Sequence, residues 1–428
     1  MKHVGEEIRN RRKQLRLTQT DVAGENMSIS KLSNIENGKL LPDPATWKHL
    51  QKKLGLSEDL LNHKQVLDQI RFMLEQAETY EATQLIERAE AKYRQCIELC
   101  ERALLYDKAG QCCRKLANIQ MNKMNHAKAI ESLKKALEMF ERTGNWERAA
   151  ECEMALTRVY YQMEQFERAL QLARRTLQRI PEDDETLKGR VHYNVASVCY
   201  RMQMFDEANF ECDQALSYLR KDEKRYRMAA LILQGILLKR ARMYTFAENR
   251  HEEAKTLALQ LNDTGSLGVC WHNLGDVAME SGLYAKAQEC FNTAVEVKRE
   301  NGDQQKLVRT YAYIAELFRR MNRPEEALKL AEWVLAETRK SRLKTDEFLI
   351  VKTLSLIWKA LGDEQRFLDL SYKAMTLADR LSFRYEKAQL LERTAHYYHG
   401  IGDEKRCVEK LHQAFLIKSA DEGEVKQA

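Results

Sequence analysis

A regular spacing of mostly small residues runs through most of this chain and constrains its fold more than any other feature. These markers recur at steps of 39 or 40 residues, at Ala129, Ala169, Ala208, Ala247, Ala287, Ala327, Phe367 and Cys407. A second, mostly small residue follows each marker after seven positions, as Ala136 follows Ala129. A fixed period in this range is typical of stacked helical repeats, which bury a continuous core and form a superhelix with a long concave surface.

The type of repeat is indicated by its cleanest copy. Residues Trp271–Gly275 followed by Ala287–Phe291 reproduce the tetratricopeptide pattern W-x-x-L-G … A-x-x-x-F at its spacing. The usual tetratricopeptide period is about 34 residues, whereas HEAT-type repeats run to about 40–47. Because the residue pattern is more specific than the length, we interpret these as tetratricopeptide repeats with longer helices.

The turn between the two helices of a repeat carries its own signal. Gly282, Gly362 and Gly402 each stand five residues before a marker, and Asn322 takes that place in another repeat. This turn requires a positive φ, which glycine adopts freely and asparagine tolerates. Ala89 is in register with the markers, so we expect one further repeat before the eight.

Composition predicts an all-α fold and narrows the function. Only four of 428 residues are proline, and the abundance of Ala, Glu, Lys, Leu and Arg favours helices. No apolar run approaches the roughly 18 residues of a membrane span, and the first residues lead into charged sequence rather than a secretory signal. We therefore expect a cytoplasmic protein without a membrane partner.

The chain contains ten cysteines, which could in principle bind a metal or form disulfides. They are scattered, and no C-x-x-C pair or Cys/His knuckle with zinc spacing is present. Buried thiols packed between helices are the favoured interpretation. No phosphate-binding loop or nucleophile motif is present either, so we expect no cofactor, no metal and no enzymatic activity.

The first 62 residues differ from the rest. They contain eleven Lys and Arg against eight Asp and Glu, a net charge of +3, with the excess concentrated in Arg9–Arg16. Thr18–Asp21 reads as a capping box, Ser28 as the cap of a helix over 29–36, and Pro42–Pro44 as the start of another helix. Ile8 and Leu15 are expected on one face of the first helix. Two short helices joined by a tight turn and followed by packing helices form a helix-turn-helix module.

This segment resembles the Cro/lambda-repressor (XRE) family of DNA-binding domains, whose hallmark is L-T-Q-x-x-[LV]-A … S-x-I-E-x-G. The matching residues are Leu17–Gln19, Val22–Ala23 and Ser33–Gly38. In helix-turn-helix domains the second helix of the motif lies in the major groove, and the first crosses the backbone. The residues expected to contact DNA are Gln19, Ser28, Ser30, Lys31, Asn34 and Lys39. The alternative is that Ser28 only caps its helix and the module only dimerises. Val22, Leu32, Ile35 and Leu50 are core in either case.

A repressor-type head on a tetratricopeptide body resembles the RRNPP family of peptide-pheromone-responsive regulators of Gram-positive bacteria, and most of all its NprR and PlcR branch. The resemblance implies an all-α, lambda-repressor-like head followed by a right-handed superhelix. The expected domains are a helix-turn-helix domain at 1–62, a linker helix and degenerate first repeat at 63–108, about eight repeats at 109–420, and a tail at 421–428. It also implies a re-imported oligopeptide that binds in the concave groove and alters binding to operator DNA.

Candidate peptide ligands lie on the first helix of each repeat. Asn194 and Asn273 occupy one register, two residues before the small mark, where an amide offers a donor and an acceptor to a peptide main chain. Family members use asparagines here in that way; the alternative is that these amides satisfy backbone between helices. The remaining candidates line the same face and are Asn118, Arg158, Tyr161, Tyr200, Arg201, Lys239, Arg240 and Asp276. Basic residues dominate this set, which favours a ligand carrying a carboxylate, although a solvated charged face is the plainer interpretation.

The partners that we expect are double-stranded operator DNA, the oligopeptide, and a second copy of the chain in a homodimer or higher oligomer. The main alternative is a Rap-like regulator whose repeats bind a protein such as a response regulator. A head that serves only for docking would then show no operator binding.

Overall fold

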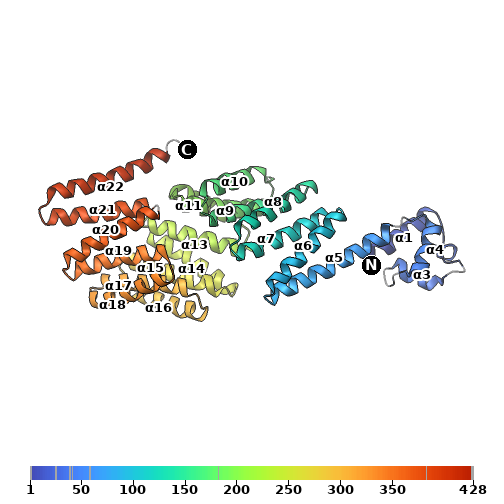
Figure 1. The fold of residues 1–428 in the computed structure, drawn as a ribbon, viewed down its shortest axis with the longest axis horizontal. Coiled ribbons are helices and arrows are strands. Elements are labelled where there is room, and N and C mark those ends of the chain that lie inside the picture. Colours follow the sequence, from blue (N-terminus) through green and yellow to red (C-terminus); the bar gives the residue numbers. More distant parts are fainter. Residues whose placement is uncertain are drawn as a thin grey trace. The chain divides into compact units, whose positions relative to one another are not determined.

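The structure is a computed structural model, and it describes residues 2–24, 27–37, 40, 42–56, 59–181, 183–381 and 383–425. Over these residues it contains twenty-two helices and no strand, which confirms the all-α prediction (Figure 1). The chain divides into two compact bodies, residues 1–184 and 185–428. None of the helices in the described ranges has both the length and the apolar character needed to cross a membrane.

The first four helices form the head, residues 2–56. They are α1 (Lys2–Gln14), α2 (Gln19–Ala23), α3 (Ile29–Glu36) and α4 (Pro44–Leu54). The predicted starts are confirmed: Thr18 and Asp21 form a capping box, and Ser28 caps α3. Predicted core residues Val22, Leu32, Ile35 and Leu50 are buried together with Ile8. Leu15 is wrongly placed by the sequence analysis, because α1 ends at Gln14 and the Leu15 side chain is 43% exposed.

The first body continues with three helix pairs, in which the A helix of each repeat precedes its B helix. They are α5 (Asp59–Ala82) with α6 (Ile86–Arg102), α7 (Tyr106–Asn122) with α8 (His126–Arg142), and α9 (Trp146–Gln162) with α10 (Phe166–Arg179). The predicted domain limits at 62/63 and 108/109 lie inside α5 and α7, so they do not coincide with helix ends.

The second body contains six further pairs (Figure 1). They are α11 (Glu185–Arg201) with α12 (Phe205–Tyr218), α13 (Lys224–Arg240) with α14 (Tyr244–Gln260), α15 (Thr264–Glu280) with α16 (Tyr284–Glu300), α17 (Gln304–Arg320) with α18 (Pro324–Lys340), α19 (Lys344–Ala360) with α20 (Glu364–Arg380), and α21 (Arg384–Gly400) with α22 (Glu404–Val425). The last helix runs through the limit predicted at 420/421.

The small markers are points of close approach between helices. All eight are buried, and the six alanines among them are completely so. Their partners on the A helices are tightly packed too: a Cβ added to Gly275 would meet the Phe291 ring at 2.7 Å. Gly235 stands in the same register one repeat earlier and faces the His251 ring. The repeating small residues therefore set the distance between the two helices of a repeat. All ten cysteines are buried and free, as predicted.

The turns within the repeats have the predicted backbone conformation. Gly282, Gly362 and Gly402 have φ of 78°, 82° and 77°, and Asn322 has φ of 59°. The sequence analysis did not anticipate that other residues adopt the same left-handed conformation in the remaining repeats. They are Gln84, Met124, Glu164, Gln203 and Arg242, with Leu104, Asn262 and Arg342 in turns between repeats.

Candidate functional site

The exposed side of α3 carries short polar side chains. Ser28, Ser30 and Asn34 are exposed. The Ser28 Oγ also accepts a hydrogen bond from the Lys31 backbone nitrogen at 3.1 Å, so this residue caps the helix. Three of the residues predicted to contact DNA are thus exposed on α3 or at its N-cap. Lys39 lies outside the described residues.

Lys31 is half-buried and contacts the start of α4. Its Nζ donates hydrogen bonds to the Asp43 Oδ2 at 2.7 Å and to the Thr46 Oγ1 at 2.8 Å. Asp43 is also the N-cap of α4. The bond from Lys31 lowers the pKa of the Asp43 carboxyl below its usual range. Lys31 therefore ties α3 to the start of α4 in this structure.

Gln19 is also held internally. Its Nε2 donates to the Glu36 Oε2 at 2.8 Å, while Arg12 binds the same carboxylate through two nitrogens at 2.6 and 3.0 Å. Glu36 is only 3% exposed. Burial opposes its charge, but the bonds from Arg12 and Gln19 outweigh burial and lower the Glu36 pKa. Gln19 and Glu36, which belong to the family hallmark, thus connect α2 to α3. Arg12 connects α1 to the same carboxylate.

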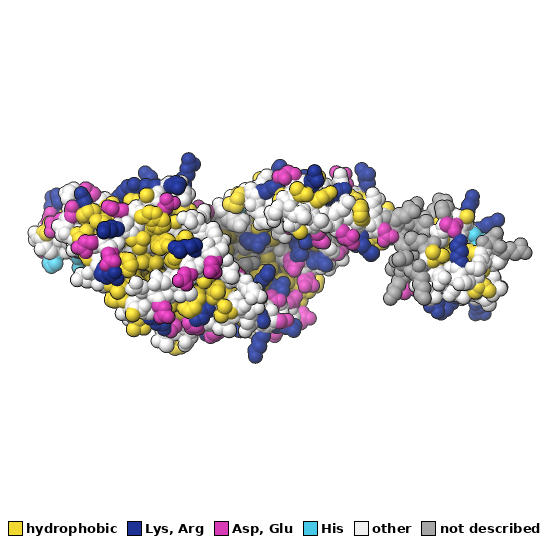
Figure 2. Space-filling view, turned by 90° about the horizontal axis from the view of Figure 1, so that it is seen from below, with side chains coloured by type: hydrophobic (Ala, Val, Ile, Leu, Met, Phe, Trp, Pro, Cys, Tyr) yellow, Lys and Arg dark blue, Asp and Glu magenta, His cyan; other side chains and the backbone are white. Residues whose placement is uncertain are grey.

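The described surface of the head carries several exposed cations on α1, after α1 and on α4. The exposed cations of its described residues include Arg9, Lys13, Arg16, Lys48, Lys52 and Lys53. Figure 2 shows Lys and Arg side chains spread over the visible face of the head. Such a surface suits a phosphate backbone, which attracts Lys and Arg without regard to sequence.

The A helices of the second body carry a charged surface that we call the inner face. Its predicted members are Asn194, Tyr200 and Arg201 on α11, Lys239 and Arg240 on α13, and Asn273 and Asp276 on α15. The Lys239 Nζ forms an ion pair with Asp276, joining α13 to α15. Burial disfavours the ammonium, but the Asp276 carboxylate outweighs this effect and raises the Lys239 pKa. The same carboxylate raises the pKa of the half-buried Tyr313 phenol on α17. These two predicted residues therefore neutralise each other.

Arg240 lies between two aromatic rings. Its guanidinium is 3.7 Å from the centre of the Phe205 ring and 4.0 Å from that of Tyr385. Tyr385 belongs to α21, four repeats after α13, so A helices far apart in sequence come close on the inner face. Cation–π contacts of this kind already occupy Arg240.

The two asparagines keep a common register and are both half-buried. The Asn273 Nδ2 is shielded from solvent and has no hydrogen-bond partner among the described residues. A buried amide donor without a partner is uncommon and asks for an explanation such as a missing ligand. The preceding residue, His272, is buried and within 3.3 Å of the Thr310 Oγ1.

Two basic residues of the inner face escaped the sequence prediction. Lys352 on α19 and Arg393 on α21 are half-buried, and neither has a carboxylate within ion-pair distance among the described residues. Burial is the main cause that lowers the pKa of both groups. The charge of Arg393 lowers the Lys352 pKa further, and Arg319 and Arg320 lower the Arg393 pKa; Glu316 opposes both shifts without cancelling them. Arg393 stands in the register of Asn194 and Asn273, so the register alone was a usable signal. For Lys352 the sequence contains no comparable signal.

Acidic groups accompany these cations on neighbouring helices. Glu316 accepts hydrogen bonds from Arg319 and Arg320, which lower its pKa despite burial. The Glu386 Oε2 is buried without a hydrogen-bond partner in the described part of the chain. Figure 2 shows hydrophobic, basic and acidic side chains interspersed on the visible surface of the second body. With Glu316 and Glu386 among its side chains, the inner face carries acidic as well as basic groups.

The other predicted residues are carried by α7, α9 and the end of α11. Asn118, Arg158 and Tyr161 belong to the first body, where the Tyr161 ring packs edge-on against Phe166. Tyr200 and Arg201 end α11 in the second body; the Tyr200 ring packs on Phe205, and Arg201 is exposed. The predicted set is therefore divided between the two bodies, and only its α11–α15 members belong to the inner face described above.

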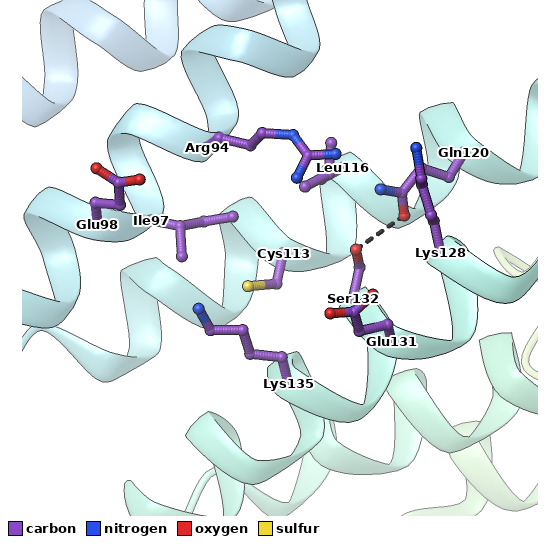
Figure 3. A pocket seen from close by; sticks show the side chains of 10 residues that line it. All are labelled: Arg94, Ile97, Glu98, Cys113, Leu116, Gln120, Lys128, Glu131, Ser132 and Lys135. Atoms are coloured by element: carbon purple, nitrogen blue, oxygen red, sulfur yellow. Dashed lines mark hydrogen bonds between the residues drawn. The ribbon is translucent and has the colours of Figure 1, made fainter. Parts of the chain in front are cut away.

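The first body has a cleft of about 310 Å³ between α6, α7 and α8. Figure 3 shows three cations, Arg94, Lys128 and Lys135, around it, and a hydrogen bond of 2.8 Å from the Ser132 Oγ to the Gln120 Oε1. None of the predicted site residues lines this cleft.

Comparison with known proteins agrees with both domains. A helix-turn-helix family matches residues 3–63, and a tetratricopeptide-repeat family matches residues 111–182 and 268–336. Comparison with curated protein sequences finds no match.

Among solved structures, similar folds include three proteins. A Rap protein complexed with competence and sporulation factor has a TM-score of 0.58 at 15% identity, over 82% of this chain and 98% of its own. Apo RapI has a TM-score of 0.53 at 15% identity, over 65% and 99%. Aspartyl phosphate phosphatase F from Bacillus subtilis has a TM-score of 0.51 at 14% identity, over 82% and 94%. At these identities the likeness concerns the fold alone. The chain is thus a helix-turn-helix protein with a tetratricopeptide-repeat body, the architecture of the RRNPP regulators that its sequence resembles.

Proposed function

We propose that this protein is a transcriptional regulator that binds operator DNA through α3 and is switched by a short peptide bound on the inner face. Support for the DNA contact comes from the exposed Ser28, Ser30 and Asn34 on a basic head. Asparagine pairs bidentately with adenine, and serine accepts or donates to several base edges. Because heads of this type bind paired half-sites, we propose that the active form is a homodimer.

The observation that carries the peptide proposal is the pair of half-buried cations without carboxylate partners, Lys352 and Arg393. A ligand carboxylate would form charge-assisted hydrogen bonds with them and relieve the penalty of their burial. The unpartnered Asn273 amide would donate to a peptide carbonyl. A protein of similar fold is known in complex with competence and sporulation factor. We therefore propose that the carboxylate of the peptide binds Lys352 and Arg393. Lys239 and Arg240 are less suited, because they already contact Asp276 and two aromatic rings.

The peptide site is tested with the full chain and a library of short synthetic peptides, each with a free or an amidated C-terminus. Lys352→Met and Arg393→Met are each expected to remove one charged hydrogen bond, about 1.5–3 kcal/mol, or roughly 10- to 150-fold in affinity. Lys405→Met removes an exposed lysine of the same body and is the control. Wild-type affinity in both inner-face variants would place the ligand elsewhere.

The DNA site is tested by footprinting and by competition with random DNA. The double variant Ser30→Ala, Asn34→Ala is expected to lose preference for the operator while binding random DNA as before, because it loses base contacts and keeps phosphate contacts. DNA binding without peptide should survive both inner-face substitutions. A footprint without dyad symmetry would argue against the dimer, and capture of a protein partner without any operator binding would favour the Rap-like alternative.

A further inference from the structure

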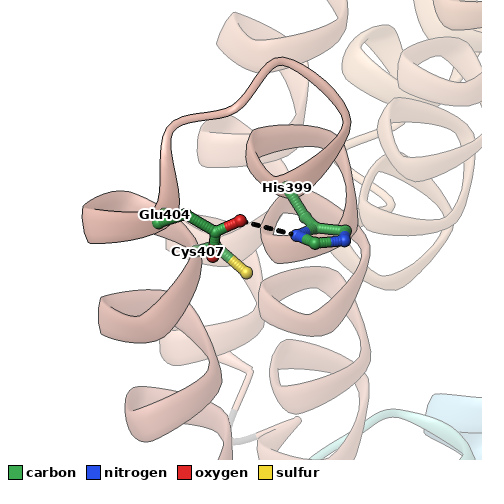
Figure 4. Close-up of side chains that lie close together, drawn as sticks. All are labelled: His399, Glu404 and Cys407. Atoms are coloured by element: carbon green, nitrogen blue, oxygen red, sulfur yellow. Dashed lines mark hydrogen bonds and ion pairs between the residues drawn. The ribbon is translucent and has the colours of Figure 1, made fainter.

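Three side chains of metal-ligand type meet at the turn between α21 and α22. They are His399, Glu404 and Cys407, whose ligand atoms all lie within 4.8 Å of one another. Figure 4 shows the His399 ring directed at the Glu404 carboxylate, with the Cys407 sulfur beside it. The His399 Nδ1 and the Glu404 Oε1 are 3.1 Å apart. The sequence analysis missed this group because its spacing, H-x4-E-x2-C, matches no familiar zinc motif.

Local structure explains why these residues meet. His399 lies in the last turn of α21, and Gly402 reverses the chain with a φ of 77°. Glu404 and Cys407 then stand three residues apart on α22, so they share one side of that helix. The turn thus places one ligand from α21 opposite two from α22.

The three ligand atoms are close enough together for a tetrahedral zinc-type ion to bind them after small side-chain rotations. Zinc binds histidine nitrogen and carboxylate oxygen at about 2.0–2.2 Å and thiolate sulfur at about 2.3 Å, which places ligand atoms about 3.3–3.6 Å apart. The observed 3.1 Å between nitrogen and oxygen is close to this separation. Cys407 is only 7% exposed and packs with Ala395 and Tyr398. His399 and Glu404 are exposed, so an ion would enter from solvent and keep water as a fourth ligand.

The group is specific to the last repeat. Cys407 occupies the marker position, where seven other repeats have alanine, counting Ala89. In the preceding repeat the three equivalent positions hold Lys359, Glu364 and Phe367, and no other repeat has more than one ligand-type residue there. A close-packing role explains a small residue at 407 but does not explain histidine and glutamate directed at it.

The neighbouring cation does not occupy the site. The Arg406 Nε is 3.4 Å from the Asp403 Oδ2, and its guanidinium lies over the Tyr398 ring at 5.5 Å. These contacts direct its charge away from the three ligand atoms.

We propose that His399, Glu404 and Cys407 form a binding site for a divalent transition metal of the zinc class. Binding replaces the proton of the Cys407 thiol with the metal and releases that proton to solvent. The ion would join the end of α21 to the start of α22. This link matters because α22 carries exposed apolar side chains, Val408, Leu411 and Phe415.

Cobalt titration of the full chain, under a non-thiol reductant, tests the site. Co²⁺ is the probe because a thiolate ligand produces a charge-transfer band in the near ultraviolet and tetrahedral coordination produces intense visible bands. We expect both in the wild type, and we expect Zn²⁺ to bleach them. Cys407→Ala restores the alanine of other repeats, so it should fold and lose the charge-transfer band. His399→Gln changes an exposed side chain and should weaken binding by more than the roughly 10- to 100-fold that loss of an outer-shell partner causes.

Two matched controls assign the signal. His396→Gln removes an exposed histidine less than one turn earlier on α21, and Cys290→Ala removes another buried cysteine of the second body. Both should keep the wild-type spectrum. Absence of a charge-transfer band in the wild type would overturn the proposal and leave a simple His399–Glu404 ion pair. A band that survives in Cys407→Ala would overturn it equally, by placing the metal at another cysteine.

Discussion

In the head, charged side chains that face inward are paired, whereas on the inner face of the second body two half-buried cations lack carboxylate partners. Arg12 and Glu36 bind each other through two hydrogen bonds, and Lys31 binds Asp43. Lys352 and Arg393 instead have lowered pKa values and no carboxylate within ion-pair distance in the described ranges. The charges of the head therefore stabilise its fold and leave short polar groups free on α3. On the inner face, Lys239 is paired with Asp276, but Lys352 and Arg393 have no such partner among the described residues, and our proposal assigns these two cations to the ligand.

The largest effect expected from this contrast is in the head. Glu36→Ala leaves the Arg12 guanidinium, 12% exposed, without its carboxylate and frees the Gln19 amide. Breaking a buried pair by removing one partner costs about 3–5 kcal/mol. We expect hydrogen exchange in residues 2–56 to rise steeply while the repeats keep their protection. Glu6→Gln, at an exposed position of α1, is the control and should change nothing. Equal protection of the head in both variants would show that the pair does not stabilise it.

The repeats depend on close packing more than on ion pairs, and Gly275→Ala tests this. The added Cβ would come within 2.7 Å of the Phe291 ring, which is completely buried and has no room to move. Overpacking of this kind costs about 1–3 kcal/mol, and we expect the upper part of that range in thermal unfolding. Gly265→Ala is a matched control on the same helix, since its nearest neighbour would lie at 3.4 Å. It should leave stability unchanged or raise it, because alanine is the better helix former.

The arrangement of the repeats was predictable from the sequence because small markers recur wherever two helices touch. The core of the head was predictable because its apolar residues, such as Val22 and Ile35, belong to the family hallmark, and both are buried. The partners of polar side chains were not predictable in this way. Gln19 and Lys31 bind Glu36 and Asp43 because folding brings together residues that no local pattern links. His399 and Cys407 meet across a turn whose spacing is not a known motif.

A buried lysine in the repeats is expected to make the stability of the protein depend on pH. Lys298 is 3% exposed, and its Nζ donates to the Thr310 Oγ1 at 2.7 Å rather than to a carboxylate. Burial, with the charges of Arg309 and Lys306, lowers its pKa from 10.5 to about 7. Between these values the unfolded chain binds more protons than the folded one, so stability rises with pH. From pH 7 to 8.5 we expect a gain of up to about 2 kcal/mol.

The Lys298→Met variant isolates this contribution. It removes the buried ammonium and keeps most of the side-chain volume, so at pH 7 we expect it to be at least as stable as the wild type. Its unfolding free energy should also rise less between pH 7 and 8.5, because the titrating group is gone. Chemical denaturation at several pH values measures both quantities. Parallel pH profiles for the two proteins would show that Lys298 does not titrate in this range.

The smallest expected effect concerns the turns, which the repeats form with and without glycine. Leu104 lies in a turn between repeats with a φ of 57°, and its side chain is 69% exposed. A left-handed conformation costs an L-residue about 1–2 kcal/mol, whereas glycine adopts it without that penalty but loses more backbone entropy on folding. Because little buried surface is removed, Leu104→Gly should raise the unfolding free energy by up to about 1 kcal/mol. The reverse change, Gly402→Ala, should lower it by a similar amount, since its φ is 77° and nothing lies within 4 Å of the added carbon. If both variants have the unfolding free energy of the wild type, then the positive φ of these turns does not cost measurable stability. Backbone strain would then not explain why glycine occurs in them.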